Sequence, residues 1–141
     1  MVSRFVGNYM HTLDAKSRLI LPAKFRSGFQ LGGYLSPDAM TSLALRDEAS
    51  FDLKCAELER ASDTHGSEAR RASQFFHAMT FQVEVDRQGR FVVPKNLLEH
   101  ANLTDEVMVV GYGNAVTFWN PATFAAEIQA PAEQTMAKDL L

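Results

Sequence analysis

The stretch HTLDAKSRLILPAKF at residues 11–25 places two cations, Lys16 and Arg18, in a predicted turn beside Asp14. A second stretch, VEVDRQGRFVVPKNL at residues 83–97, repeats the same order of acidic, basic and apolar residues. Both contain D-x-x-x-R-φ-φ-φ-P, where φ is an apolar residue, at an offset of 72 residues. A match of this length is much harder to reach by chance than a two-residue match. The chain is therefore predicted to be a duplication of one unit.

Each copy is predicted to begin with two strands joined by a turn. Polar and apolar residues alternate over 9–13 and 81–85, which is typical of half-buried strands. The three apolar residues after each arginine predict a second strand that is buried on both faces. Asp86 and Gly89 suit the intervening turn, because Asp bonds nearby amides and Gly tolerates positive φ. Ser17 replaces this glycine in the first copy, so its turn is expected to be strained or of another type.

Proline and glycine positions, together with periodicity, predict the remaining elements. Each motif ends in a proline that suits the first turn of a short helix, at 23–27, stopped by Gly28, and at 95–101. Residues 63–67 are expected to be a linker, and residues 133–141, which no copy matches, to fray. The predicted hairpins and longer helices are, in chain order, 33–45 (hairpin), 47–61, 68–79, 106–119 (hairpin) and 121–130.

The composition is that of an ordinary globular protein. The 141 residues are 46% apolar and 22% charged, enough for one core or two small coupled cores. No apolar run reaches the roughly 20 residues that span a bilayer, and no secretory signal pattern begins the chain. We therefore expect a cytoplasmic protein with no membrane partner. Cys55 is the only cysteine, which excludes an intramolecular disulfide and favours a packing role for this side chain.

Charge is unevenly distributed along the chain. The net charge of −3 argues mildly against a nucleic-acid partner. Residues 1–30, however, carry five basic side chains against Asp14 alone, whereas residues 46–63 and the segment from 99 onward are acidic. The basic side chains of this first segment are Arg4, Lys16, Arg18, Lys24 and Arg26. Cations therefore gather around the motif, which favours an anionic partner there over charge that only keeps the protein in solution.

The two motif stretches, together with EVMVVGYGNAVTFWN at 106–120, resemble the MraZ family, transcriptional regulators with two SpoVT-AbrB-type domains. The resemblance implies an α+β fold, mainly β: a duplicated swapped-hairpin β-barrel that forms an intramolecular pseudo-dimer with flanking helices. It also implies ring-like homo-oligomers and nucleoid-associated, sequence-specific binding to double-stranded DNA. In this family the usual target is the division and cell-wall gene cluster, including the regulator's own promoter, which is repressed at tandem short repeats.

Domain boundaries follow from the repeat and the resemblance. We expect a first SpoVT-AbrB-type domain at 5–51, a helical connector at 52–79, a second domain at 80–123, and a C-terminal helix and tail at 124–141. Each domain is expected to complete its barrel with a hairpin from the other. Neither domain is therefore expected to be stable alone.

Candidate DNA-binding residues are the cations of the two turns and their neighbours. In the first turn Arg18 is the better base reader, because a guanidinium can make bidentate contact with guanine, while Lys16 suits a phosphate. Asp14 and Asp86 are expected to order the turns, since carboxylates rarely face DNA phosphates. The first copy is richer in cations, so it is expected to provide the main DNA surface. The candidate contacts are Lys16, Arg18, Arg4, Lys24, Arg26, Arg87 and Arg90.

Two other classes of function are weighed against DNA binding. An enzyme is not expected, because the four histidines and Cys55 are scattered and form no recognised catalytic, metal or phosphate-binding motif. No cofactor or metal site is predicted. A protein-interaction module whose basic turns bind an acidic partner remains the alternative. Linear dependence of log affinity on log salt, together with preference among duplexes, separates DNA binding from that alternative.

Overall fold

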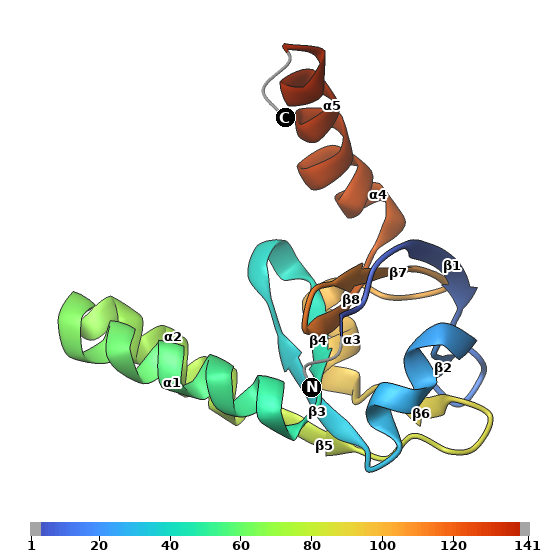
Figure 1. The fold of residues 1–141 in the computed structure, drawn as a ribbon, viewed down its shortest axis with the longest axis horizontal. Helices are drawn as coiled ribbons and strands as arrows, with labels where there is room; N and C mark the ends of the chain where they lie inside the picture. Colours follow the sequence, from blue (N-terminus) through green and yellow to red (C-terminus); the bar gives the residue numbers. More distant parts are fainter. Residues whose placement is uncertain (1–3, 139–141) are drawn as a thin grey trace.

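Two antiparallel sheets form the centre of the structure, a computed structural model that describes residues 4–138 (Figure 1). The larger sheet has six strands in the order β1-β7-β8-β4-β3-β5, and the smaller is a ribbon of β2 and β6. The strands are β1 (Asn8–Thr12), β2 (Arg18–Ile20), β3 (Gly33–Pro37), β4 (Leu43–Arg46), β5 (Phe81–Val83), β6 (Arg90–Val92), β7 (Glu106–Tyr112) and β8 (Ala115–Trp119). The predicted α+β, mainly β, duplicated fold is confirmed.

The two copies of the motif exchange strands throughout both sheets. β1 of the first copy pairs with β7 of the second, and β5 of the second copy pairs with β3 of the first. β2 pairs with β6, and β4 pairs with β8 at the centre of the large sheet. Hairpins β3–β4 and β7–β8 stay within their own copies, as predicted. Each half of the chain therefore supplies hydrogen-bond partners that the other half lacks.

The core lies between the ribbon and the large sheet. Leu19 and Phe91 face inward from the ribbon and are 0% and 2% exposed. Phe91 meets Phe118 of β8 with ring centroids 5.4 Å apart. Phe25 and Phe29 close one end from the 3-10 helix η1 (Ala23–Phe29), and Leu97 closes another from α3 (Lys95–Ala101). Burial of these side chains draws on both halves, so the halves share one core.

Both ribbon strands expose one face, contrary to the expectation that they are buried on both. Ile20 and Val92, the middle apolar residues of the two runs, are 39% and 53% exposed. Only two strands form the ribbon, and its outer face stays partly open to solvent among residues 4–138, so residues alternate between the core and a partly exposed face. The first short helix also differs from prediction: it runs past Gly28, because Phe29 is anchored in the core at 1% exposure.

Two helices form an arm between the copies, seen in green at the left of Figure 1. Helix α1 (Glu48–His65) begins at Asp47, which caps the amide of Ser50 at 2.8 Å, and α2 (Ser67–Ala78) follows directly. The predicted linker at 63–67 is therefore wrong. Gly66 alone, at φ 79°, reverses the chain, and the polar residues before it continue the helix.

The C-terminal segment is a second projecting helix, longer than predicted (Figure 1). It comprises α4 (Pro121–Phe124), the π-helical segment η3 (Ala125–Gln129) and α5 (Ala130–Ala137). Pro131 does not end the helix: it lies just after the π-helical segment, and Gln129 and Ala130 before it keep helical φ and ψ. The fraying expected from residue 133 is therefore not seen through Ala137. Residues 139–141 lie outside the described residues.

Exchange of strands predicts that neither half folds alone. Residues 1–66 lack the partners of β1 and β2, and residues 67–141 lack the partners of β5 and β6. Each fragment should give no cooperative thermal transition by circular dichroism, whereas the co-expressed fragments should co-purify and melt together. A cooperative transition of isolated, monomeric 1–66 would contradict an interlocked core.

Candidate nucleic-acid interface

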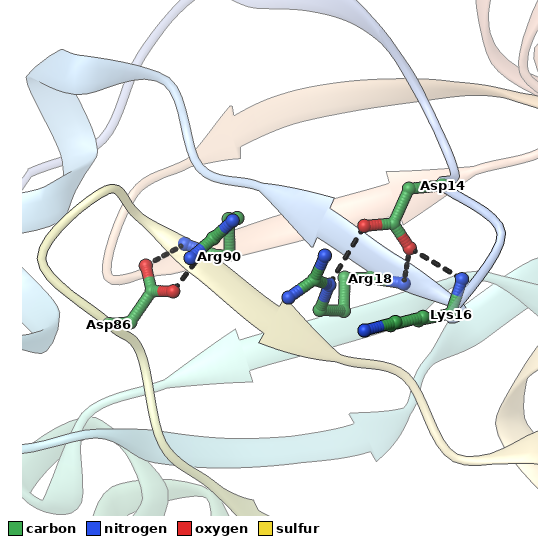
Figure 2. A network of polar contacts seen from close by, with 5 residues as sticks. All are labelled: Asp14, Lys16, Arg18, Asp86 and Arg90. Carbon is green, nitrogen blue, oxygen red and sulfur yellow. Dashed lines mark hydrogen bonds and ion pairs between the residues drawn. The ribbon is translucent and has the colours of Figure 1, made fainter.

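The first turn is organised by the carboxylate of Asp14 (Figure 2). Its Oδ1 accepts hydrogen bonds from the backbone amides of Lys16 and Arg18, both at 2.9 Å. Its Oδ2 accepts one from Nε of Arg18 at 2.8 Å. A backbone bond from the amide of Ser17 to the Asp14 carbonyl, at 3.1 Å, closes the turn. One side chain thus orders the loop and orients the arginine.

The second turn repeats these contacts. Oδ1 of Asp86 accepts from the amides of Gln88 and Arg90 at 2.9 Å, and Oδ2 accepts from Nε of Arg90 at 2.8 Å. Gly89 donates to the Asp86 carbonyl at 2.9 Å. The two turns are therefore of the same type, so of the two alternatives expected for Ser17, a strained turn or another type of turn, the structure shows the strained one. The strain arises because Ser17 adopts φ 59° where the second copy has glycine at φ 85°.

The carboxylates of both turns favour their ionised form. The backbone hydrogen bond from Arg18 is the main cause that lowers the pKa of Asp14, and the corresponding bond from Arg90 lowers the pKa of Asp86. The Nε hydrogen bond adds to this at each site, and desolvation acts in the opposite direction but is outweighed. At neutral pH each arginine is therefore held by a charged partner.

The ribbon brings the two arginines to one outer face. Arg18 lies opposite Val92, and Arg90 lies opposite Ile20, so the two guanidinium groups are diagonal neighbours. Figure 2 shows both arginines between the two aspartates, with a turn at each end of the ribbon. Their side chains are 29% and 34% exposed. Each aspartate binds only Nε, so within residues 4–138 no acceptor bonds the terminal nitrogens, which remain available for a planar pair of acceptors.

Four of the other candidate residues are exposed, and they divide into two groups. Lys16 and Arg87 are exposed in the turns, and Lys24 is exposed on η1, just after the ribbon. Arg4 is exposed but lies elsewhere: it precedes Phe5, which bridges to Gly113 at the tip of the β7–β8 hairpin. This places Arg4 at the opposite end of β1 from the first turn.

Arg26 is occupied inside the structure. Its Nε donates to the carbonyl of Leu21 at 2.9 Å, and its side chain lies against Gly89 of the second turn. Burial first, and then the charge of Arg26, lowers the pKa of His11. Arg26 thus links the two copies. Sequence position alone grouped it with the free cations, because its contact partner lies 63 residues away in the chain.

Residue types suited to catalysis do not gather into one site. Among the described residues, no group of three or more His, Cys, Asp and Glu side chains is placed to hold a metal ion. The ring nitrogens of His65 and His77 make local bonds within their own helices. Burial, followed by Asp52 and Glu59, raises the pKa of the Cys55 thiol, which disfavours the reactive thiolate.

Sequence reasoning missed Ile20 and Val92 as surface residues. The signal was present in the alternation: if an arginine of the ribbon faces solvent, the residue two places later faces the same side. A run of three apolar residues concealed this alternation. Exposed Ile20 and Val92 therefore belong to the same surface as Arg18 and Arg90.

Comparison with known proteins identifies the family that shares this duplicated sequence. The family model described as "MraZ protein, putative antitoxin-like" matches residues 4–73 and 76–140, which is nearly the whole chain in two segments. The chain belongs to the MraZ family. Relatives in this family carry the name Transcriptional regulator MraZ.

Three MraZ relatives illustrate the similarity. The protein of Leuconostoc mesenteroides is 39% identical over 124 residues, covering 86% of this chain and 85% of that one. The protein of Mycoplasmopsis pulmonis is 35% identical over 118 residues, covering 84% and 80%. The protein of Leuconostoc citreum is 35% identical over 130 residues, covering 92% and 90%.

Among residues 4–138, no helix is long and apolar enough to cross a lipid bilayer.

Exchanging the residues that precede the two arginines, Ser17 and Gly89, should change the stability of the protein in opposite directions. Ser17→Gly should raise the free energy of unfolding by up to about 1.5 kcal/mol. Glycine removes the cost of the left-handed conformation of Ser17, roughly 1–2 kcal/mol. It also raises the conformational entropy of the unfolded chain, which lowers the gain by about 0.4–1 kcal/mol. Urea unfolding followed by circular dichroism measures this change.

Gly89→Ser should lower stability, because a Cβ there would overlap Nε of Arg26 and displace its bond to Leu21. The double variant Gly89→Ser, Arg26→Ala serves as the control and should recover part of the loss. An equal cost of Gly89→Ser with arginine and with alanine at position 26 would contradict the packing of Arg26 on the second turn, because the strain at φ 85° is the same in both backgrounds.

Proposed function

We propose that this chain is a sequence-specific, double-stranded DNA-binding transcriptional regulator that reads DNA with the outer face of the β2–β6 ribbon. The observation that carries the proposal is the pair of arginines held by Nε on one two-stranded ribbon. The major groove of B-DNA, about 12 Å wide, admits a two-stranded ribbon. Terminal nitrogens of Arg18 and Arg90 suit the O6 and N7 acceptors of guanine. The names of the MraZ relatives support this class of function.

The exposed cations around the ribbon are assigned to phosphates. Lys16 and Arg87 flank the two turns, and Lys24 follows β2. Two or three phosphate contacts per chain give a slope of log affinity against log salt of only about −2 to −3, which means weak binding. A homo-oligomeric ring would multiply these contacts through effective concentration at tandem short repeats. We include such assembly in the proposal.

Both turns contribute in this proposal, although the first carries more cations. The first domain, 5–51, and the second, 80–123, each supply one strand of the ribbon, and most of the two projecting helical segments falls in the connector at 52–79 and in the described part of the C-terminal segment from 124 onward. We leave Arg4 and Arg26 out of the interface, because one lies at the far end of β1 and the other bonds Leu21. Repression of the division and cell-wall gene cluster from its own promoter, in the nucleoid, is the physiological form that we propose.

Substitution of the ribbon arginines should weaken recognition more than nonspecific affinity. Arg18→Ala and Arg90→Ala should each cost about 1–3 kcal/mol per site and relax preference among duplexes, because each removes a bidentate base contact. Lys16→Ala should weaken all duplexes alike. Fluorescence anisotropy with duplexes selected from a random pool measures both effects at several salt concentrations.

Arg60→Ala provides a matched control, since this exposed arginine lies on the α1 arm away from the ribbon. The affinity of the Arg60→Ala protein for the selected duplex should equal that of the unaltered chain. A folded, still oligomeric Arg18→Ala protein with unchanged affinity and preference would refute the assignment. Salt-sensitive binding to polyglutamate, without preference among duplexes, would instead favour the acidic-partner module.

A further inference from the structure

Two exposed aliphatic side chains lie at equivalent places on the outer face of the ribbon. Ile20 and Val92 are 39% and 53% exposed, and the 72-residue offset of the motif relates them to one another. Each lies directly opposite an arginine of the other strand, Ile20 opposite Arg90 and Val92 opposite Arg18. The outer face therefore presents two arginine–aliphatic pairs, one on each side of the central pair Leu19 and Phe91, whose side chains face the core.

The position of these side chains distinguishes them from scattered surface apolar residues. Both are β-branched, so they are stiff and stand out from the strand. They adjoin the only guanidinium groups that Asp14 and Asp86 orient in the described residues. A ligand that fills this face must therefore offer planar hydrogen-bond acceptors beside an apolar group.

The major-groove edge of DNA offers this combination at one kind of sequence. Guanine supplies the acceptors O6 and N7, and thymine supplies the C5-methyl group, an apolar group that cytosine lacks. Residues directly opposite across a ribbon are about 5 Å apart, whereas successive bases rise about 3.4 Å. An arginine on a guanine thus brings its aliphatic neighbour to a base one or two steps away.

We propose that Ile20 and Val92 contact thymine methyl groups, so that each ribbon selects thymine one or two steps from the guanine bound by Arg90 or Arg18. The inference rests on the proposed DNA-binding function and adds a determinant of specificity to it. It assigns both copies of the motif a base-reading role, with one apolar and one polar contact each. The register relates the two contacts symmetrically, because Val92 lies opposite Arg18 as Ile20 lies opposite Arg90.

Replacing thymine by deoxyuridine tests the contact, because this removes the methyl group and leaves the hydrogen-bonding edge intact. The experiment uses the full-length chain and a duplex selected from a random pool, with deoxyuridine introduced at one thymine at a time. Affinity should fall about threefold to fivefold at the contacted positions, the value of one buried methyl group. Ile20→Ala and Val92→Ala should each bind thymine and uracil equally at one set of positions.

Two further variants keep the test specific. Leu31→Ala removes a fully exposed leucine outside the ribbon and should keep the full preference for thymine over uracil. Ile20→Val keeps a β-branched side chain at the ribbon and should keep most of the preference for thymine over uracil. Circular dichroism and gel filtration establish that each variant retains its fold and assembly.

The outcomes separate this inference from the function on which it rests. Equal affinity of the unaltered chain for thymine and uracil at every position, while Arg18→Ala still relaxes preference, would overturn the methyl contact alone. Dispersal of the oligomer by Ile20→Ala with an unchanged preference for thymine would also overturn it, and would make the pair a subunit contact. Failure of the random pool to enrich any sequence would overturn both proposals.

Discussion

The pairing of β2 with β6 is the interaction on which the rest of the structure depends. Beyond the paired strands, the amide of Leu21 donates to the carbonyl of Gly89 at 2.8 Å, and that of Val93 donates to Ser17 at 2.9 Å. These bonds bind each strand to the turn of the other copy. The alternation of the ribbon then directs Leu19 into the shared core and Arg18 outward. One ladder therefore joins the halves and creates the candidate surface.

The copies differ where their turns meet the body of the protein. Gly89 is buried beneath Arg26, so position 89 has no room for a side chain. Position 17 has room, and Ser17 carries a side chain at the cost of a left-handed conformation. Arg26 itself corresponds to Leu98 in the second copy. Duplication has thus kept the Asp–Arg geometry the same in both turns and changed the packing behind them. Conservation of that geometry within one chain is why we assign both turns to one surface.

Much of this architecture could be predicted from local sequence. Helix α3 and the β7–β8 hairpin follow from a proline, from Gly111 to Asn114, and from apolar periodicity, all of which act over a few residues. The length of α1 was missed because the polar residues at its end resemble a linker in composition, although none of them breaks the helix before Gly66. Exposure of Ile20 follows from its two-residue spacing to Arg18, but the run of three apolar residues concealed this alternation. The role of Arg26 could not be predicted, because it depends on a contact with the distant second turn.

Hydroxyl-radical footprinting of the protein, read by mass spectrometry, tests most directly whether both turns form one DNA face. The unaltered oligomer would be labelled alone, with a selected duplex, and with a scrambled duplex of equal length. The selected duplex should protect side chains at 14–20 and at 86–92 to a similar extent, with little change on α1, α2 or α5. Protection of the first turn alone, or of the projecting helices instead of the ribbon, would contradict the account.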